Sequence, residues 1–182
     1  LNTRYVIYNP EQQPLKNPYA FGNAWFVDKL DMVDNADAEI EALNTIDPLR
    51  TAVVDKRFQE DLEGFVPQKD STATIVLEEY RPNRLTYKSK ADKEQLAVFS
   101  EVYYQPGWKA TVDGKEVPHF RADWILRGMR VPAGEHTIVF EFRPSGYVTP
   151  AYVSSYSSFL ILLLLIAAIG WSGWKYWKKS KN

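Results

Sequence analysis

The C-terminal part of the chain carries its longest hydrophobic run. No charged side chain occurs between Pro144 and Trp174, and every residue from Phe159 to Trp171 is apolar. With its flanking serine, glycine and tryptophan residues the run reaches about 20 residues, the length that a helix needs to cross a bilayer core. The pattern predicts one transmembrane helix over residues 157–177. A buried core helix is the alternative interpretation.

The residues that end this run indicate its orientation. Aromatic side chains, which favour the headgroup region, are mixed with lysines: Trp171, Trp174, Lys175, Tyr176, Trp177, Lys178, Lys179 and Lys181. Because lysines next to a span stay on the cytoplasmic side, we expect a cytoplasmic basic tail over residues 178–182 and an extracytoplasmic body before the span. The competing topology is a tail-anchored protein with a cytosolic body.

The start of the chain bears on how the body is exported. Its first residues, Leu1-Asn2-Thr3, show neither the basic segment nor the apolar segment of an export signal. An extracytoplasmic body whose only span is C-terminal needs such a signal. We therefore expect a fragment of a longer protein of the inner (cytoplasmic) membrane, with the lipid bilayer and an upstream transmembrane domain of the same polypeptide as its partners.

The N-terminal part mixes strand and helix patterns. Thr3–Tyr8 is β-branched and aromatic and predicts a strand, and a second strand is predicted from Ala24 to about Val33. Asp34–Leu43 predicts a short helix, which Asp34 or Asn35 caps and which places Ile40 and Leu43 on one face. Thr51–Val54 predicts a brief buried strand. The segment from Phe58 to Phe65 is ambiguous.

From residue 72 onward the pattern is steadily that of β-strands. Alternating or β-branched segments separated by turn residues predict strands over 72–80, 84–90, 96–104, 108–112, 115–117, 124–131 and 136–142. Asp113-Gly114 joins two of them, and this dipeptide favours the positive φ angles of a type I′ hairpin turn.

Together these segments predict a mainly β protein. We expect an antiparallel β-sandwich, immunoglobulin-like or jelly-roll-like, with a short helix and one C-terminal transmembrane helix. The expected organisation is an N-terminal α+β segment over 1–70 that packs with the sandwich, a sandwich core over 71–148, a linker over 149–156, then the span and the tail.

Composition excludes several kinds of function. The chain has 22 basic and 23 acidic residues, and lysines of the tail account for part of the basic ones, so the body is mildly acidic and unsuited to nucleic acid. It has no cysteine, which rules out disulfides, thiolate metal sites and a cysteine nucleophile. His119 and His136 lie too far apart for a metal pair, and we expect both at the surface or at a strand edge. No catalytic motif, metal cluster or cofactor motif is present.

One aromatic patch has the residue types of a ligand site. Tyr104 and Trp108 lie near Arg121 and Trp124, and such rings beside polar groups can stack on a sugar and bond its hydroxyls. These four residues are our candidates for glycan contact. The alternative is structural, with Trp108 in the sandwich core and Arg121 in a partly exposed ion pair with Asp123.

The same residues carry a resemblance to a known family. The segments Glu101–Pro118, Arg121–Arg127 and Val131–Ile138, followed by the Leu-rich span, resemble the C-terminus of YfhO-family bacterial membrane proteins. The earlier segments Leu1–Pro10, Gly22–Val27 and Thr51–Asp55 look like members of the Bacteroidetes type. The resemblance covers essentially the whole chain, in order.

The resemblance implies a larger parent protein. The family is similar to GT-C glycosyltransferases, polytopic proteins that take sugar from a polyprenyl-phosphate carrier. Their expected catalytic acid lies in an early extracytoplasmic loop, so the resemblance assigns no catalytic residue to this chain. It implies an accessory domain that packs over the catalytic loops or holds envelope glycan or lipid-linked sugar. The alternative is a non-catalytic, membrane-anchored binding or scaffold module.

Overall fold

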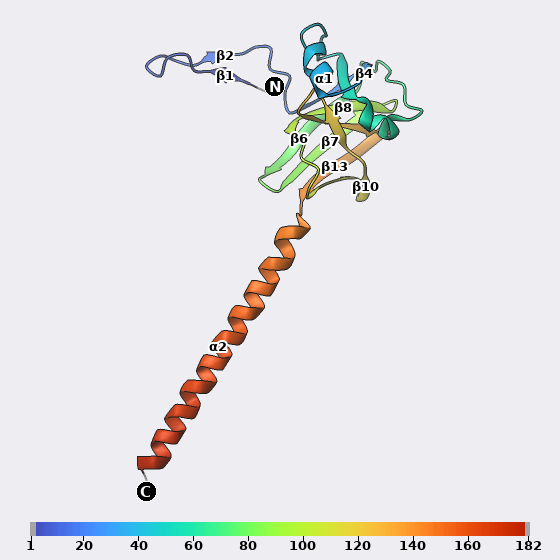
Figure 1. The fold of residues 1–182 in the computed structure, drawn as a ribbon. Helices are drawn as coiled ribbons and strands as arrows, with labels where there is room; N and C mark the ends of the chain where they lie inside the picture. The colour runs from blue at the N-terminus through green and yellow to red at the C-terminus, as the bar shows by residue number, and fades with distance from the viewer. Residues whose placement is uncertain (1–2, 181–182) are drawn as a thin grey trace. The chain divides into compact units, whose positions relative to one another are not determined.

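The structure is a computed structural model, and it describes residues 3–180. Two units make up the chain (Figure 1): a β-rich unit that ends at Phe142 and a helical unit that begins at Arg143. Each unit is described by itself below.

Two antiparallel sheets form the body of the β-rich unit. The five-stranded sheet has the order β10-β9-β13-β7-β6, and the four-stranded sheet has the order β11-β12-β8-β3. The first sheet contains β6 (Thr74–Arg81), β7 (Arg84–Ala91), β9 (Trp108–Val112), β10 (Lys115–Val117) and β13 (Gly134–Phe142). The second contains β3 (Ala24–Val27), β8 (Gln95–Val102), β11 (Phe120–Ala122) and β12 (Leu126–Val131).

Side chains from both sheets meet in one hydrophobic core. Its centre is an aromatic trio in which the Phe99 ring lies 4.9 Å from the rings of both Tyr87 and Phe140, edge to face. All three side chains are fully buried. Edge-to-face contacts at this distance are favourable beyond the area that they bury.

The order of the elements confirms the predicted mainly β fold with antiparallel sheets, a short helix and a C-terminal apolar helix.

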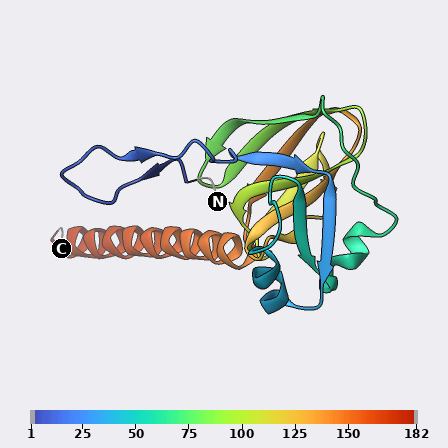
Figure 2. The same ribbon diagram turned by 90° about the horizontal axis from the view of Figure 1, so that it is seen from above.

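The four-stranded sheet is also buried on its other face. A second cluster joins Trp25, Leu96 and Val98 of this sheet to Val54 and Leu62 of the N-terminal region. Strand β8 is therefore covered on both sides, which explains why Leu96–Phe99 is an unbroken apolar run instead of an alternating one. Figure 2 shows the N-terminal strands, in blue and teal, beside the green and yellow strands of the sandwich.

The single strand predicted over Ala24–Val33 is wrong, because the structure divides it. β3 joins the four-stranded sheet, while β4 (Lys29–Val33) pairs in parallel with β5 (Thr51–Asp55). The break falls at Asp28, whose carboxylate binds Arg50 at 2.7 Å. The backbone N–H groups of Asp28 and Lys29 both donate to the Arg50 carbonyl oxygen. The predicted strand at Thr3–Tyr8 shrinks to β1 (Tyr5–Val6), paired with β2 (Leu15–Lys16).

The predicted short helix is confirmed as α1 (Ala36–Ala42). Asn35 caps it, because its side-chain oxygen accepts a hydrogen bond of 2.9 Å from the Ala38 N–H. The predicted apolar face is wrong, since Ile40 is exposed and the buried residue of the helix is Glu39. The ambiguous segment after β5 forms a 3-10 helix, η1 (Lys56–Leu62).

The Asp113-Gly114 hairpin is confirmed. Val112 pairs with Lys115, and both turn residues have positive φ, 49° at Asp113 and 81° at Gly114, as a type I′ turn requires.

His136, expected at the surface or at a strand edge, is only slightly exposed, and its Nδ1 lies 2.6 Å from the Asp113 carboxylate. This pairing, with the bond to the Ala133 carbonyl, raises the pKa of His136 and lowers that of Asp113.

The helical unit consists of α2 (Ser145–Ser180). It contains one candidate membrane span, Tyr152–Lys178, whose side chains are exposed throughout, unlike those of a core helix. Residues 149–156, expected as a linker, are helical here and belong to α2, with Pro150 inside the helix. Residues 181–182 of the expected tail lie outside the described residues.

Candidate binding groove and the neighbouring ion cluster

The four residues that the sequence singled out for glycan contact do not share one site. Trp108 lines an open groove, whereas Arg121 is held in a buried ion cluster. Tyr104 follows the end of β8 and is 54% exposed. Trp124 is 41% exposed and lies in the turn between β11 and β12, not in the strand predicted from residue 124.

The groove has a volume of about 620 Å³, within the range of small-molecule sites. Three segments form its walls: the 3-10 helix η1, the segment that follows β8, and the β9–β10 hairpin with the loop after it. The lining residues are Arg57, Phe58, Asp61, Tyr103, Gln105, Trp108, Lys109, Ala110, Glu116, Val117, Pro118 and His119.

The side-chain spacing of a 3-10 helix explains how η1 forms one wall of the groove. Side chains at i and i+3 eclipse one another in a 3-10 helix, so Phe58 and Asp61 project from the same side. Asp55 starts the helix by accepting a hydrogen bond of 2.9 Å from the Arg57 N–H. The Phe58 ring then packs edge to face on Tyr103, with centroids 5.7 Å apart. The spacing of Phe58 and Asp61 was the available signal, but it has this meaning only once the segment is known to be helical.

Trp108 is fixed from beneath by a buried arginine. The Arg127 guanidinium carbon lies 4.1 Å from the centroid of the indole, and Arg127 is only 2% exposed. Its Nε donates a hydrogen bond of 3.0 Å to the Val102 carbonyl oxygen. Phe142, paired with Trp108 across the sheet, adds a ring contact at 5.3 Å. The ring is therefore pre-positioned by a cation–π contact in a desolvated place, where such contacts are strongest.

His119, expected at the surface or at a strand edge, is half-buried at the base of the groove. Its ring lies between Tyr103 and Phe140, with centroids 5.7 Å from each. Burial and the nearby Arg127 charge lower the pKa of His119 to about 4, so the imidazole is neutral at pH 7. Its Nε2 atom is buried and has no hydrogen-bond partner among the described residues, as is true of the Tyr87 hydroxyl and one Arg127 nitrogen.

Asp61 differs from the other charged residues of the groove. Arg57 binds Asp55 at 2.8 Å, and Lys109 binds Glu116 at 2.9 Å. Across residues 3–180, the Asp61 carboxylate makes neither an ion pair nor a side-chain hydrogen bond. Burial, helped by the neighbouring Glu60 charge, raises the pKa of Asp61. The groove thus contains one half-buried carboxylate with free acceptor positions.

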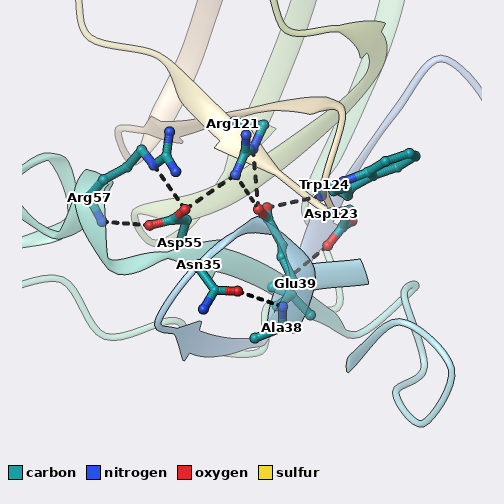
Figure 3. Close-up of polar contacts among 9 residues, drawn as sticks. Asn35, Ala38, Glu39, Asp55, Arg57, Arg121, Asp123 and Trp124 are labelled. Atoms are coloured by element: carbon teal, nitrogen blue, oxygen red, sulfur yellow. Dashed lines mark hydrogen bonds and ion pairs between the residues drawn. The ribbon is translucent and has the colours of Figure 1, made fainter. Parts of the chain in front are cut away.

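A buried ion cluster lies at the start of η1, next to the groove (Figure 3). The Arg121 guanidinium donates to the Glu39 carboxylate at 2.7 Å and lies 3.3 Å from Asp55, and both acids are almost fully buried. Asp55 also binds Arg57. The expected ion pair between Arg121 and Asp123 is wrong, because Glu39, which is 82 residues distant in sequence, takes the guanidinium instead.

Asp123 has a different role in this region. Its Oδ1 accepts a hydrogen bond of 2.9 Å from the Val53 N–H, and its own N–H donates to the Val53 carbonyl oxygen. Within the described part of the chain its Oδ2 is buried without a partner. Burial raises the pKa of Asp123 to about 6, and the nearby Glu39 charge acts in the same direction.

The turn after Asp123 has an unusual backbone. Asp123 and Trp124 have φ values of 51° and 71°, and the Ile125 N–H donates back to the Asp123 carbonyl oxygen at 2.8 Å. A positive φ at a bulky residue inside such a three-residue turn is strained and persists only where the surroundings enforce it. Here Glu39 enforces it by accepting the Trp124 N–H.

The described residues contain no group of three or more His, Asp and Glu side chains arranged to hold a metal ion. What the fold provides is a β-sandwich with an open groove, joined in sequence to a helix that can cross a membrane. The class of protein so defined is a membrane-attached β-sandwich protein.

Comparison with protein families agrees with this class. The family described as bacterial membrane protein YfhO matches residues 59–154, just over half of the chain, and the chain belongs to this family. No curated protein and no solved structure matches significantly.

Proposed function

We propose that the chain is the extracytoplasmic C-terminal accessory domain and last transmembrane helix of a polytopic membrane protein. This parent resembles the polyprenyl-phosphate-sugar-dependent glycosyltransferases of cell-envelope glycan assembly. The domain holds the acceptor glycan, and sugar transfer belongs to the upstream membrane part. The observation that carries the proposal is the groove beside Trp108, in which aromatic rings and free polar groups lie together.

Charge at the end of the span supports the proposed topology. Lys175 and Lys178 lie at the far end of the candidate span from the β-rich unit, and lysines beside a span stay in the cytoplasm. The β-rich unit then faces the outside of the inner membrane. Glycan assembled on a lipid carrier would be presented on that side.

The chemistry of the groove suits weak binding of sugar. The indole of Trp108 can stack on the apolar face of a pyranose ring, while Asp61, Gln105 and the Tyr103 hydroxyl can exchange hydrogen bonds with its hydroxyls. An open groove of this kind should bind a fragment with a Kd of about 1 mM, equivalent to about 4 kcal/mol.

Saturation-transfer NMR with fragments of bacterial envelope glycan tests the proposal. The full chain in phospholipid nanodiscs should transfer saturation to a bound fragment, and Trp108→Ala should abolish the transfer. Trp124→Ala removes an exposed tryptophan outside the groove and is the matched control. The glycan-holding role fails if no fragment receives saturation, or if the Trp124 variant alone loses it.

A second candidate function is a non-catalytic, membrane-anchored binding or scaffold module. The strained turn favours it, because the buried acid Glu39 holds the backbone of Trp124, and this residue is 41% exposed. This arrangement presents a rigid aromatic side chain without a groove. A chain that binds no glycan fragment would favour this second candidate.

A further inference from the structure

Three charged groups of the groove already have partners, and one does not. Arg57 is neutralised by Asp55 and Lys109 by Glu116. Asp61 faces the groove without a partner among residues 3–180. Because an uncompensated carboxylate repels anions, the groove is unsuited to a phosphorylated or acidic ligand. Its unpaired oxygens are instead acceptors for hydroxyl or N–H donors.

The surroundings of Asp61 decide which donors fit. Tyr103 lines the same groove as Asp61. Burial and then the Asp61 charge raise the pKa of the Tyr103 phenol. The wall formed by Phe58, Tyr103 and Trp108 is aromatic, and the His119 imidazole beside it is neutral at pH 7. Aromatic rings and an unpaired carboxylate in one groove match a pyranose, which has an apolar C–H face and hydroxyls at its edge.

We propose that Asp61 is the residue that fixes a neutral saccharide in this groove, by accepting hydrogen bonds from two neighbouring hydroxyls of one sugar ring. The ring stacks on Trp108, which Arg127 holds from the other face. The proposal rests on the proposed glycan-holding function and adds its specificity: neutral sugars bind, and sugars with a carboxylate at this position do not.

Because Asp61 is partly buried, a hydrogen bond to its carboxylate should contribute measurably to saccharide binding. Hydrogen bonds to a charged acceptor are stronger than neutral ones, and the loss of one from a partly desolvated site weakens binding by about tenfold or more. Glu60 is adjacent in the same 3-10 helix, is exposed, and does not line the groove. It is the natural control for a change of charge at this place.

The test is titration of the full chain in phosphatidylcholine nanodiscs, followed by saturation-transfer NMR. Cellobiose, mannobiose and diacetylchitobiose serve as neutral probes and cellobiouronic acid as the acidic one. Wild type should bind at least one neutral probe, and more tightly than the acidic probe. Asp61→Asn should weaken that binding by about tenfold or more, while Glu60→Gln should retain it.

The outcomes separate the two proposals. If Asp61→Asn binds as tightly as wild type, or if wild type prefers the acidic probe, the role of Asp61 is overturned while glycan holding stands. If wild type binds neither these probes nor any envelope glycan fragment, the glycan-holding function itself fails and the role of Asp61 fails with it.

Discussion

The backbone N–H of Trp124 donates a hydrogen bond of 2.9 Å to the carboxylate of Glu39, which is 85 residues earlier in the chain. The same carboxylate binds the Arg121 guanidinium. One buried acid therefore joins α1 to both the strand β11 and the strained turn that follows it. The bond explains how a turn with an unfavourable φ angle at a bulky residue is maintained.

Removal of this acid should be strongly destabilising. Glu39→Ala leaves the Arg121 charge without its main partner and the Trp124 N–H unpaired, so we expect a loss of about 3 kcal/mol or more in the free energy of unfolding. Glu41→Ala changes an exposed acid of the same helix and should cost no more than about 0.5 kcal/mol. Urea unfolding of the full chain in nanodiscs, followed by tryptophan fluorescence, measures both. Equal losses would contradict the role of Glu39.

Asp123 should make stability depend on pH. Its folded-state pKa is raised to about 6 from an ordinary value of 3.8, so the folded state holds its proton in a range where the unfolded state has released it. The contribution of Asp123 to the free energy of unfolding is therefore most favourable below about pH 4, and it is lost as the pH rises through about 6. Asp123→Asn keeps an oxygen for the Val53 N–H and removes the charge.

Unfolding of wild type and Asp123→Asn at pH 5 and pH 8 tests this sign. The free energy of the variant relative to wild type should become more favourable at pH 8 by about 1–3 kcal/mol. Groups that do not interact with Asp123 titrate equally in both proteins, so they cancel in the difference. A relative stability that does not change with pH would refute the assignment.

Gly128 should resist even the smallest side chain. It faces Phe120 across the β11–β12 pair, and an added Cβ would clash with the ring of Phe120, which is fully buried. Gly128→Ala should therefore cost about 1–3 kcal/mol through overpacking. If the ring is the cause, the cost should fall when Phe120→Leu is combined with it, and a double-mutant cycle by urea unfolding measures that coupling. No coupling would indicate another cause.

The type I′ turn gives a fourth stability test. Gly114 has a φ of 81° and open space around its Cα, so only the backbone conformation limits a substitution there. Gly114→Val should cost about 1 kcal/mol or more, because a β-branched residue avoids positive φ. Gly114→Asn is the control, since asparagine accepts this conformation, and its cost should be smaller. Thermal unfolding of both variants measures these losses of stability. Similar losses for valine and asparagine would contradict the explanation from positive φ.

The orientation in the membrane can be tested cleanly because the chain has no cysteine. Lys115→Cys places a thiol on the exposed β9–β10 hairpin, and Lys178→Cys places one at the end of the candidate span. In cells, a membrane-impermeant maleimide should label the first and not the second. The reverse pattern would favour the tail-anchored topology with a cytosolic body.

Features that depend on neighbouring residues could be predicted from the sequence. The cap at Asn35 needs only the next few backbone N–H groups, and the Asp113-Gly114 turn needs only its own φ angles. The apolar run in α2 is likewise legible without any tertiary contact. The strand at residues 24–33 was misjudged because the break at Asp28 depends on Arg50, 22 residues further along.

The candidate site was harder to predict from the sequence for the same reason, because it depends on contacts between distant residues. Of the four predicted contact residues only Trp108 lines the groove, because Glu39 takes Arg121 into the ion cluster and fixes the Trp124 turn beside it. Asp61 was missed because the sequence left the segment from Phe58 to Phe65 ambiguous, and its place on the groove depends on that segment being helical. Arg127, which holds the Trp108 ring, reads in sequence as an ordinary strand residue.

Burial of β8 on both faces has a consequence for where the folded domain must begin in the chain. The family match begins at residue 59, inside η1, yet the cover of the four-stranded sheet comes from earlier residues, including Ala52 and Val54. A protein trimmed to the matched stretch would lose β3 from the sheet edge and open an apolar face to water, and such a face promotes aggregation. The stretch that matches the family thus leaves out residues that the β-rich unit uses to bury its four-stranded sheet.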